Sequence, residues 1–102
     1  MLSGSKALIM GYGRIGRILA HKLRGLHSDI YISARKYEDF AWINAFGYKG
    51  IGYDELDKVI SEFDVVFNTV PVLLLDKNRL QKLKQNVVII DLASNPGGVG
   101  FV

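Results

Sequence analysis

The stretch Gly11-Tyr12-Gly13-Arg14-Ile15-Gly16 decides how this chain folds. A short apolar run at residues 7–10 stands directly before it. Directly after it, apolar residues recur at helical spacing, at Ile15, Ile18, Leu19 and Leu23. This order is typical of a strand, a tight glycine turn and a helix, although an ordinary glycine-rich turn is the alternative.

Each glycine of the turn has a separate physical role. Gly11 allows the tight turn, Gly13 allows a ligand to approach the backbone, and Gly16 allows the helix to pack closely on the strand. The free N–H groups and the positive dipole end of the helix favour a pyrophosphate there. We therefore predict that a dinucleotide cofactor binds over Gly11, Tyr12, Gly13, Arg14, Ile15 and Gly16.

Length and composition indicate one soluble globular domain over residues 1–102. Apolar residues make up 49% of the chain and charged residues 23%, which is the balance of a folded protein. The longest apolar stretch is far too short to cross a membrane, and Gly11 interrupts the first apolar run too early for a signal peptide. The absence of cysteine excludes disulfides and thiol catalysis, and is compatible with the cytoplasm.

The charges and the histidines exclude two further classes of site. The net charge of +3 is spread among acidic residues without a basic run, so we expect no nucleic-acid partner. His21 and His27 are the only histidines, and no cluster has the spacing of metal ligands, so we expect no metal. His21 is expected at the surface, and Trp42 in partly buried packing.

The rest of the chain alternates strands and helices. We expect further strands over residues 29–34, 48–51, 64–69 and 87–91. We expect helices between them. One runs from about Tyr37 to a left-handed Gly47, with Phe40, Ile43 and Phe46 turned inward, one is capped by Asp54 and one is capped by Asp76. Buried strands joined by amphipathic helices predict an α/β, Rossmann-like, doubly wound parallel sheet of order 3-2-1-4-5.

In that topology the ligand crevice lies at the carboxyl ends of the first and fourth strands. Four loops converge there, over residues 11–16, 33–36, 68–71 and 91–98. No sixth strand follows the glycine-rich loop near residue 98. We therefore expect a Rossmann domain that is truncated at its C-terminus and belongs to a longer chain.

The residues after the second strand predict the choice of cofactor. A site for NAD usually has a carboxylate about 20 residues beyond the glycine turn. Here the stretch reads Ser33-Ala34-Arg35-Lys36, with no carboxylate before Glu38. Arg35 could hold a 2′-phosphate through two hydrogen bonds, which favours NADP, with NAD possible. Alternatively, Arg35 stacks on the adenine and both cofactors are accepted.

Two further loops supply polar candidates. Residues Asn68, Thr69, Val70 and Pro71 leave the fourth strand, where an amide or hydroxyl can bind a ribose or a nicotinamide. Asp91 and Ser94 leave the fifth strand near the expected nicotinamide. The alternatives are that residues 68–71 only mark a turn and that Asp91 only caps its loop. We find no acid–base pair, so the catalytic residues stay unknown.

Three later segments carry a family resemblance. Tyr53-Asp54-Glu55-Leu56, then the run at residues 67–71, then Ile90-Asp91-Leu92-Ala93-Ser94-Asn95-Pro96-Gly97-Gly98 follow one another as they do in the A subunits of dipicolinate synthase. The chain resembles the nucleotide-binding domain of that family over nearly its whole length. Its glycine turn is also similar to that of D-2-hydroxyacid dehydrogenases and adenosylhomocysteinase.

The resemblance implies a function and partners. It implies oxidation of a tetrahydrodipicolinate-type dicarboxylate to dipicolinate during sporulation, with hydride passing to a nicotinamide cofactor. It also implies an additional N-terminal domain and a flavoprotein-like second subunit. Two alternatives stay open: a hydroxyacid-type dehydrogenase and a non-catalytic nucleotide-sensing domain, both of which usually have an acidic residue after the second strand.

Overall fold

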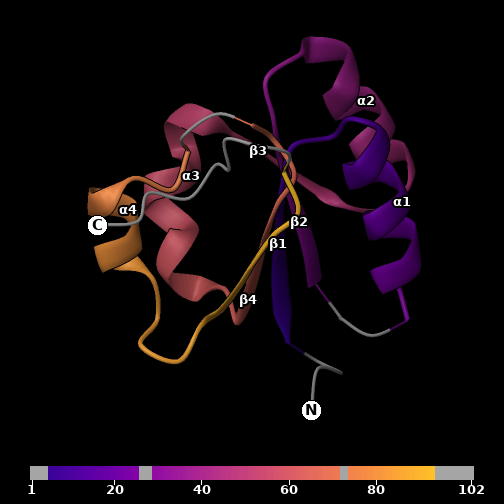
Figure 1. Ribbon diagram of the computed structural model, residues 1–102. Helices are drawn as coiled ribbons and strands as arrows, with labels where there is room; N and C mark the ends of the chain where they lie inside the picture. The colour runs from indigo at the N-terminus through magenta and orange to yellow at the C-terminus, as the bar shows by residue number, and fades with distance from the viewer. Residues whose placement is uncertain (1–4, 26–28, 72–73, 94–102) are drawn as a thin grey trace.

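The computed structural model describes residues 5–25, 29–71 and 74–93. Five parallel strands form one sheet in the order β3-β2-β1-β4-β5 (Figure 1). They are β1 (Lys6–Met10), β2 (Asp29–Ala34), β3 (Lys49–Gly52), β4 (Val65–Asn68) and β5 (Val88–Asp91). The predicted α/β fold and the predicted strand order are confirmed.

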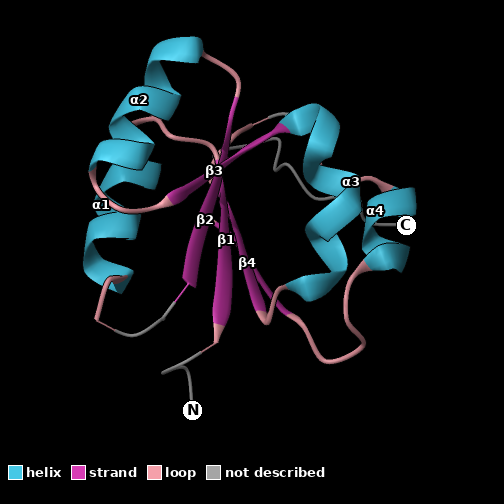
Figure 2. Ribbon diagram, turned by 180° about the vertical axis from the view of Figure 1, so that it is seen from behind, coloured by secondary structure: helices cyan, strands magenta, loops and turns pink. Residues whose placement is uncertain are grey.

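Helices cover both faces of the sheet. Figure 2 shows α1 (Arg14–Leu23) and α2 (Tyr37–Ala45) on one face, and α3 (Leu56–Val59) and α4 (Lys77–Lys82) on the other. Ala20 and Leu23 are the apolar side chains that α1 buries, whereas Ile15 and Ile18 are 47% and 53% exposed. The apolar residues that predicted this helix thus extend beyond the face that it buries.

The central strand β1 joins two separate cores. Leu8 and Ile9 follow one another on β1, are fully buried and point to opposite faces, as successive strand residues must. Ile9 belongs to the core under α1 and α2, and Leu8 to the core that includes Leu56 and Phe63. Burial on both faces is the reason why the strands are almost entirely apolar.

The predicted start of the helix after β3 is wrong. Residues 53–62 form three short pieces, η1 (Tyr53–Glu55), α3 and η2 (Ile60–Glu62). Asp54 lies inside the first piece and is exposed, and neither η1 nor α3 has a side-chain cap. The 3-10 turn begins one residue before Asp54, so this carboxylate is already inside the helical backbone and cannot act as the N-cap.

Two other predicted helix ends are confirmed, and one inward side chain is not. The Asp76 carboxylate accepts a hydrogen bond from the Arg79 N–H at 3.0 Å, which caps α4. Gly47 has the left-handed φ of +86° that ends α2. Phe46, which we expected inside, is 47% exposed because the chain turns away at the end of α2.

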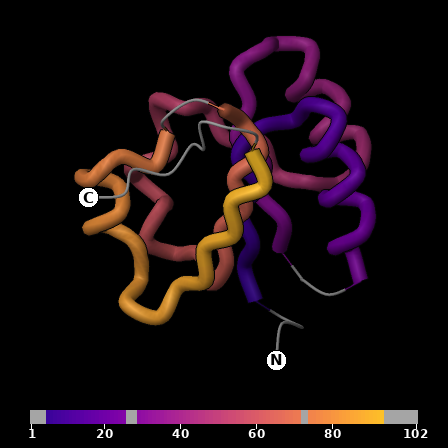
Figure 3. Tube along the Cα trace, in the orientation of Figure 1, coloured from indigo at the N-terminus to yellow at the C-terminus, as the bar shows by residue number. Residues whose placement is uncertain are grey.

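The yellow segment of the tube in Figure 3 is β5, which runs beside β4 at the edge of the sheet. The Val88 N–H donates to the Asp64 carbonyl at 3.0 Å, and the Leu92 N–H donates to the Asn68 carbonyl at 2.8 Å. The first bond extends the ladder to the residue before β4, and the second extends it to the residue after β5. They bring Asp91 beside Asn68, at the carboxyl end of the sheet.

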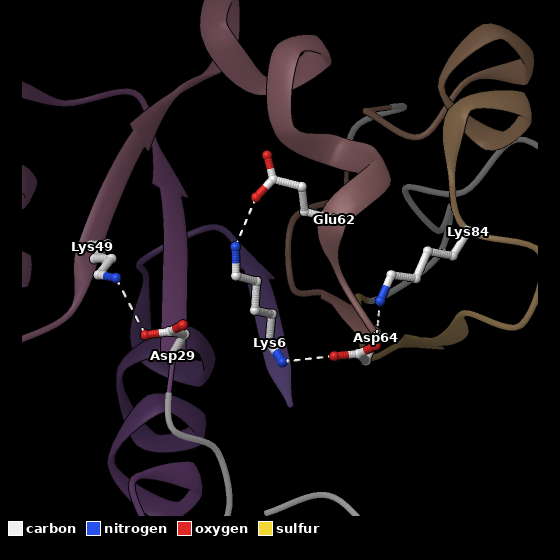
Figure 4. Close-up of polar contacts among 6 residues, drawn as sticks. All are labelled: Lys6, Asp29, Lys49, Glu62, Asp64 and Lys84. Atoms are coloured by element: carbon white, nitrogen blue, oxygen red, sulfur yellow. Dashed lines mark hydrogen bonds and ion pairs between the residues drawn. The ribbon is translucent and has the colours of Figure 1, made fainter. Parts of the chain in front are cut away.

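Polar contacts tie the elements together at the opposite, amino end of the sheet (Figure 4). The Lys6 ammonium pairs with Glu62 at 2.7 Å, and the Lys6 backbone N–H donates to the Asp64 carboxylate at 2.8 Å. The same carboxylate receives the Lys84 ammonium. Exposed pairs of this kind contribute at most about 1 kcal/mol each. They stabilise the end of the sheet that lies away from the candidate site.

Candidate dinucleotide site

A cavity of about 430 Å³ lies at the carboxyl end of the sheet. Three of the four predicted loops border it: the glycine turn, the exit of β2 and the exit of β4. Its lining residues are Gly11, Tyr12, Gly13, Arg17, Ala34, Arg35, Lys36, Asp39, Tyr53, Val70 and Pro71. The fold therefore brings together segments that are up to 60 residues apart in the sequence.

Gly11 and Gly16 make the turn possible because neither position has room for a side chain. Gly11 has a φ of +107°, and a Cβ there would lie 2.6 Å from the Thr69 Oγ1. A Cβ at Gly16 would lie 2.3 Å from the carbonyl oxygen of Gly11. The Gly11 N–H donates to the Ser33 carbonyl at 2.9 Å, so the turn is also tied to β2.

Gly13 is different, because its missing side chain leaves open space. A Cβ at this position would meet no atom within 4 Å, and Gly13 lines the cavity. It precedes α1 and provides no side-chain cap, so the first N–H groups of the helix stay available as hydrogen-bond donors. A phosphate fits this arrangement of open backbone, helix N-terminus and cavity.

The charges around the cavity favour an anion. Three cationic side chains line it, those of Arg17, Arg35 and Lys36, against the single carboxylate of Asp39 among the described lining residues. Burial raises the pKa of Tyr53, and the positive charge of Arg35 opposes this rise. Tyr53 and Arg35 thus face the same space, with a flat ring and a guanidinium that suit a purine.

The wall beside the glycine turn combines an aromatic ring and a guanidinium. The Arg17 guanidinium lies 5.4 Å from the centroid of the Tyr12 ring, within cation–π range. Burial raises the pKa of Tyr12, and Arg17 opposes the rise. Tyr12 is almost buried, so this predicted site residue contributes a fixed wall to the cavity.

Other predicted residues hold the carboxyl ends of the strands together without lining the cavity. The Asn68 Nδ2 donates to the Val70 carbonyl at 2.8 Å and to the Asp91 carboxylate at 3.2 Å. The same Asp91 oxygen accepts the Ala93 N–H at 3.1 Å, so Asp91 caps its own loop. The Thr69 hydroxyl donates to the Met10 carbonyl at 2.8 Å.

Some predicted residues lie elsewhere. Arg14 and Ile15 are exposed on α1, Gly16 packs on the turn, and none of them lines the cavity. Ser33 is fully buried, and its hydroxyl has no hydrogen-bond partner among the described residues. Ser94 and the loop over residues 94–98 lie outside the described residues.

Two cavity residues were not expected from the sequence. Asp39 lies in the first turn of α2, and Tyr53 opens η1. Arg17, one helical turn into α1, is a basic residue beside the glycine turn that was expected near the phosphates. Asp39 could have been found as a carboxylate soon after β2, but Glu38 stands before it and is the nearer candidate. Tyr53 opens a segment that carries the family resemblance, but its position at the cavity follows only from the pairing of β3 with β2.

Within the described part of the chain, no three His, Asp or Glu side chains gather to hold a metal ion. The same residues include no helix that is long and apolar enough to cross a membrane.

Comparison with known proteins shows the family of this chain. The model of the NAD-binding domain of D-isomer specific 2-hydroxyacid dehydrogenases matches residues 1–96. The chain is 31% identical over 100 residues to the A subunit of dipicolinate synthase from Bacillus subtilis strain 168, covering 98% of this chain and 34% of that protein. It is 32% identical over 97 residues to mitochondrial formate dehydrogenase of Solanum tuberosum, covering 90% of this chain and 25% of that protein.

The crystal structure of the A subunit of dipicolinate synthase from Bacillus halodurans has the same fold, with a TM-score of 0.92 at 29% identity. The match covers 97% of this chain and 34% of that one. The chain thus spans about a third of the length of the dipicolinate synthase subunits that it matches. It is similar to them over nearly all of its residues, and it belongs to the family of the NAD-binding domain of D-isomer specific 2-hydroxyacid dehydrogenases.

Proposed function

We propose that this chain is the cofactor domain of a longer oxidoreductase and that it prefers NADP to NAD. The observation that carries the proposal is the shared cavity of the glycine turn and the exit of β2. The turn offers open backbone at Gly13 for a pyrophosphate, and Arg35 and Lys36 border the same space. A dinucleotide whose phosphates lie on the turn would extend its adenosine toward these two cations.

The choice between the cofactors depends on three side chains. Arg35 can hold a 2′-phosphate through two charge-assisted hydrogen bonds, and Lys36 adds a second positive charge. Asp39 acts in the other direction, because its carboxylate accepts hydrogen bonds from ribose hydroxyls and repels a phosphate. With two cations against one carboxylate at this end of the cavity, we expect NADP to bind more tightly.

The bound cofactor would supply the hydride chemistry, and the chain would supply binding and orientation. Arg17 and the first N–H groups of α1 would hold the pyrophosphate, while Tyr53 and Arg35 would border the adenine. Asn68 is locked by its hydrogen bonds to Val70 and Asp91, which makes the exit of β4 a rigid support near the nicotinamide end. No general acid or base is assigned in this chain.

The similarity to the A subunit of dipicolinate synthase supports a finer proposal. We infer that the whole enzyme oxidises a tetrahydrodipicolinate-type dicarboxylate to dipicolinate during sporulation, with a flavoprotein-like second subunit. The support is identity over 98% of the chain and a TM-score of 0.92. The competing proposal is a D-2-hydroxyacid dehydrogenase, which the family match and the carboxylate of Asp39 in the cavity favour.

Titration calorimetry of this chain with NADP, NAD and ATP tests the cofactor role. We expect saturable binding of NADP, weaker binding of NAD and the weakest binding of ATP. Tighter binding of ATP than of either dinucleotide would overturn the oxidoreductase proposal in favour of a nucleotide sensor. Absence of binding by all three would overturn the site itself.

The substrate needs a second experiment, because proximity of substrate and cofactor depends on a further wall. We expect no reduction of NADP when this chain alone meets a tetrahydrodipicolinate-type substrate. The longer enzyme that contains this domain should reduce NADP with that substrate and not with D-lactate. Turnover with D-lactate instead would support the hydroxyacid dehydrogenase.

A further inference from the structure

A second cavity lies between α1 and α2, on the outer side of one face of the sheet. Its volume is about 320 Å³, and its lining residues are Tyr12, Arg17, His21, Trp42, Phe46 and Tyr48. Tyr12 and Arg17 also line the candidate dinucleotide site, so they separate the two cavities. The other four side chains belong to this cavity and not to the first.

Aromatic rings form most of its wall. Trp42 lies on α2 and Phe46 is its C-cap residue, with ring centroids 6.1 Å apart and planes inclined by 24°. The Phe46 and Tyr48 centroids are 6.4 Å apart. Trp42, which we expected in partly buried packing, is 57% exposed, and Phe46 is 47% exposed. A flat ring placed between the helices would cover this apolar surface.

Cationic and hydrogen-bonding groups face these rings from the other helix. Arg17 and His21 lie one turn apart on α1, and both line the cavity. The Arg24 guanidinium lies 5.8 Å from the centroid of Tyr48 and adds a positive charge near the end of the cavity. None of the described lining residues is a carboxylate. The cavity is therefore complementary to a ligand that is both aromatic and negatively charged.

We propose that this cavity is a second binding site, which takes a single-ring aromatic carboxylate. The ring would stack against Trp42 and Phe46, and the carboxylate would pair with the Arg17 guanidinium, whose planar fork suits it. The volume is at the small end of ligand cavities, which fits one ring and excludes a dinucleotide. Four of its six residues lie outside the dinucleotide site, and Arg17, which lines both cavities, is the cation that the two proposals share.

The single tryptophan of the chain gives this proposal a direct readout, because its indole N–H produces one NMR signal from the cavity wall. The ligands to be titrated are benzoate and pyridine-2,6-dicarboxylate. Cyclohexanecarboxylate controls for charge without an aromatic ring, and benzamide controls for a ring without charge. We expect a saturable shift of the Trp42 signal with both aromatic acids, and binding at least about tenfold weaker with the two controls.

Variants then locate the site. Arg17→Gln and Phe46→Ala should each weaken binding of the aromatic acids by about tenfold. Lys22→Gln removes the same charge from α1 at an exposed position that does not line the cavity, and it should bind as the wild type does. Circular dichroism of each variant checks that it is folded.

Three results would overturn the proposal: an unshifted Trp42 signal with both acids, equal affinity for cyclohexanecarboxylate, or equal losses in Lys22→Gln and Arg17→Gln. A shift that occurs only with a peptide carrying Phe beside Glu, and not with the free acids, would also overturn it in favour of a protein partner. The Phe46→Ala variant keeps every residue of the dinucleotide site, so its NADP affinity should not change. The experiments thus distinguish failure of the aromatic-carboxylate proposal from failure of the cofactor proposal.

Discussion

A Cβ at Gly16 would lie 2.3 Å from the carbonyl oxygen of Gly11, a distance that no real side chain tolerates. The helix α1 begins within one turn of this contact, so the close approach sets how α1 leaves the end of β1. The third glycine of the motif is therefore needed for the fold itself, separately from any ligand.

Gly16→Ala should destabilise the chain even in the absence of cofactor. The obstacle is backbone, which must shift, so we expect a loss of about 1–3 kcal/mol in the free energy of unfolding. Urea denaturation followed by circular dichroism measures it. Gly25→Ala is the control, because a Cβ there meets no atom within 4 Å. Equal stability of the two variants would show that the turn relaxes without cost.

The ion pair between α3 and α4 should make stability depend on pH. The hydrogen bond from Arg79, at 3.0 Å, holds the pKa of the Asp57 carboxyl below its usual range. A lowered folded-state pKa stabilises the fold above the unfolded value of about 3.9, and this contribution is lost as the pH falls through the folded-state pKa. We expect Asp57→Asn to be less stable than the wild type at neutral pH, with a difference that shrinks in acid.

Thermal unfolding at a series of pH values measures that difference. Asp54→Asn is the matched control, because Asp54 is exposed and has no ion-pair partner among the described residues. A constant difference between the wild type and Asp57→Asn at all pH values would contradict the account.

Cofactor choice should respond in opposite directions to two neighbouring substitutions. Arg35→Ala should weaken NADP by about tenfold or more and change NAD little, because the lost hydrogen bonds are to the 2′-phosphate. Asp39→Asn should strengthen NADP relative to NAD, because it removes the one carboxylate of the described lining. Calorimetric titration of both variants with both cofactors measures this. Equal losses for NAD and NADP in Arg35→Ala would instead indicate stacking on the adenine.

The sequence predicts the sheet well because each strand carries its own signal. In the strand Val65–Asn68 the first three residues are apolar and the last is polar, which is typical of a buried parallel strand. The reversal of strand order follows from right-handed connections once the glycine turn has been recognised. The segment around Asp54 was mispredicted because an N-cap residue and a residue inside a 3-10 turn have the same local composition.

The site was only partly predictable, for a physical reason. The glycine turn and Arg35 lie at strand ends, where the topology alone places ligands. Tyr53 reaches the cavity through the pairing of β3 with β2, which no local pattern encodes. Asp39 was passed over because Glu38 is the nearer carboxylate after β2. Ser33 was expected to face a ligand, but β2 is an interior strand whose end is covered on both faces, and its side chain is completely buried.

Gly13 gives the most direct test of the dinucleotide site, because it separates binding from folding. A Cβ at this position meets no atom within 4 Å, so Gly13→Val should fold with a circular dichroism spectrum and stability close to those of the wild type. Its branched side chain would extend into the cavity where the pyrophosphate must approach the backbone. Gly25→Val carries the same change at an exposed position outside the cavity, with equally open space, and serves as the control.

The deciding measurement is therefore calorimetric titration of the wild type, Gly13→Val and Gly25→Val with NADP. We expect the wild type and Gly25→Val to bind NADP with the same affinity, while folded Gly13→Val loses detectable binding. A folded Gly13→Val that binds NADP as tightly as the wild type would contradict the assignment of this turn as the pyrophosphate site.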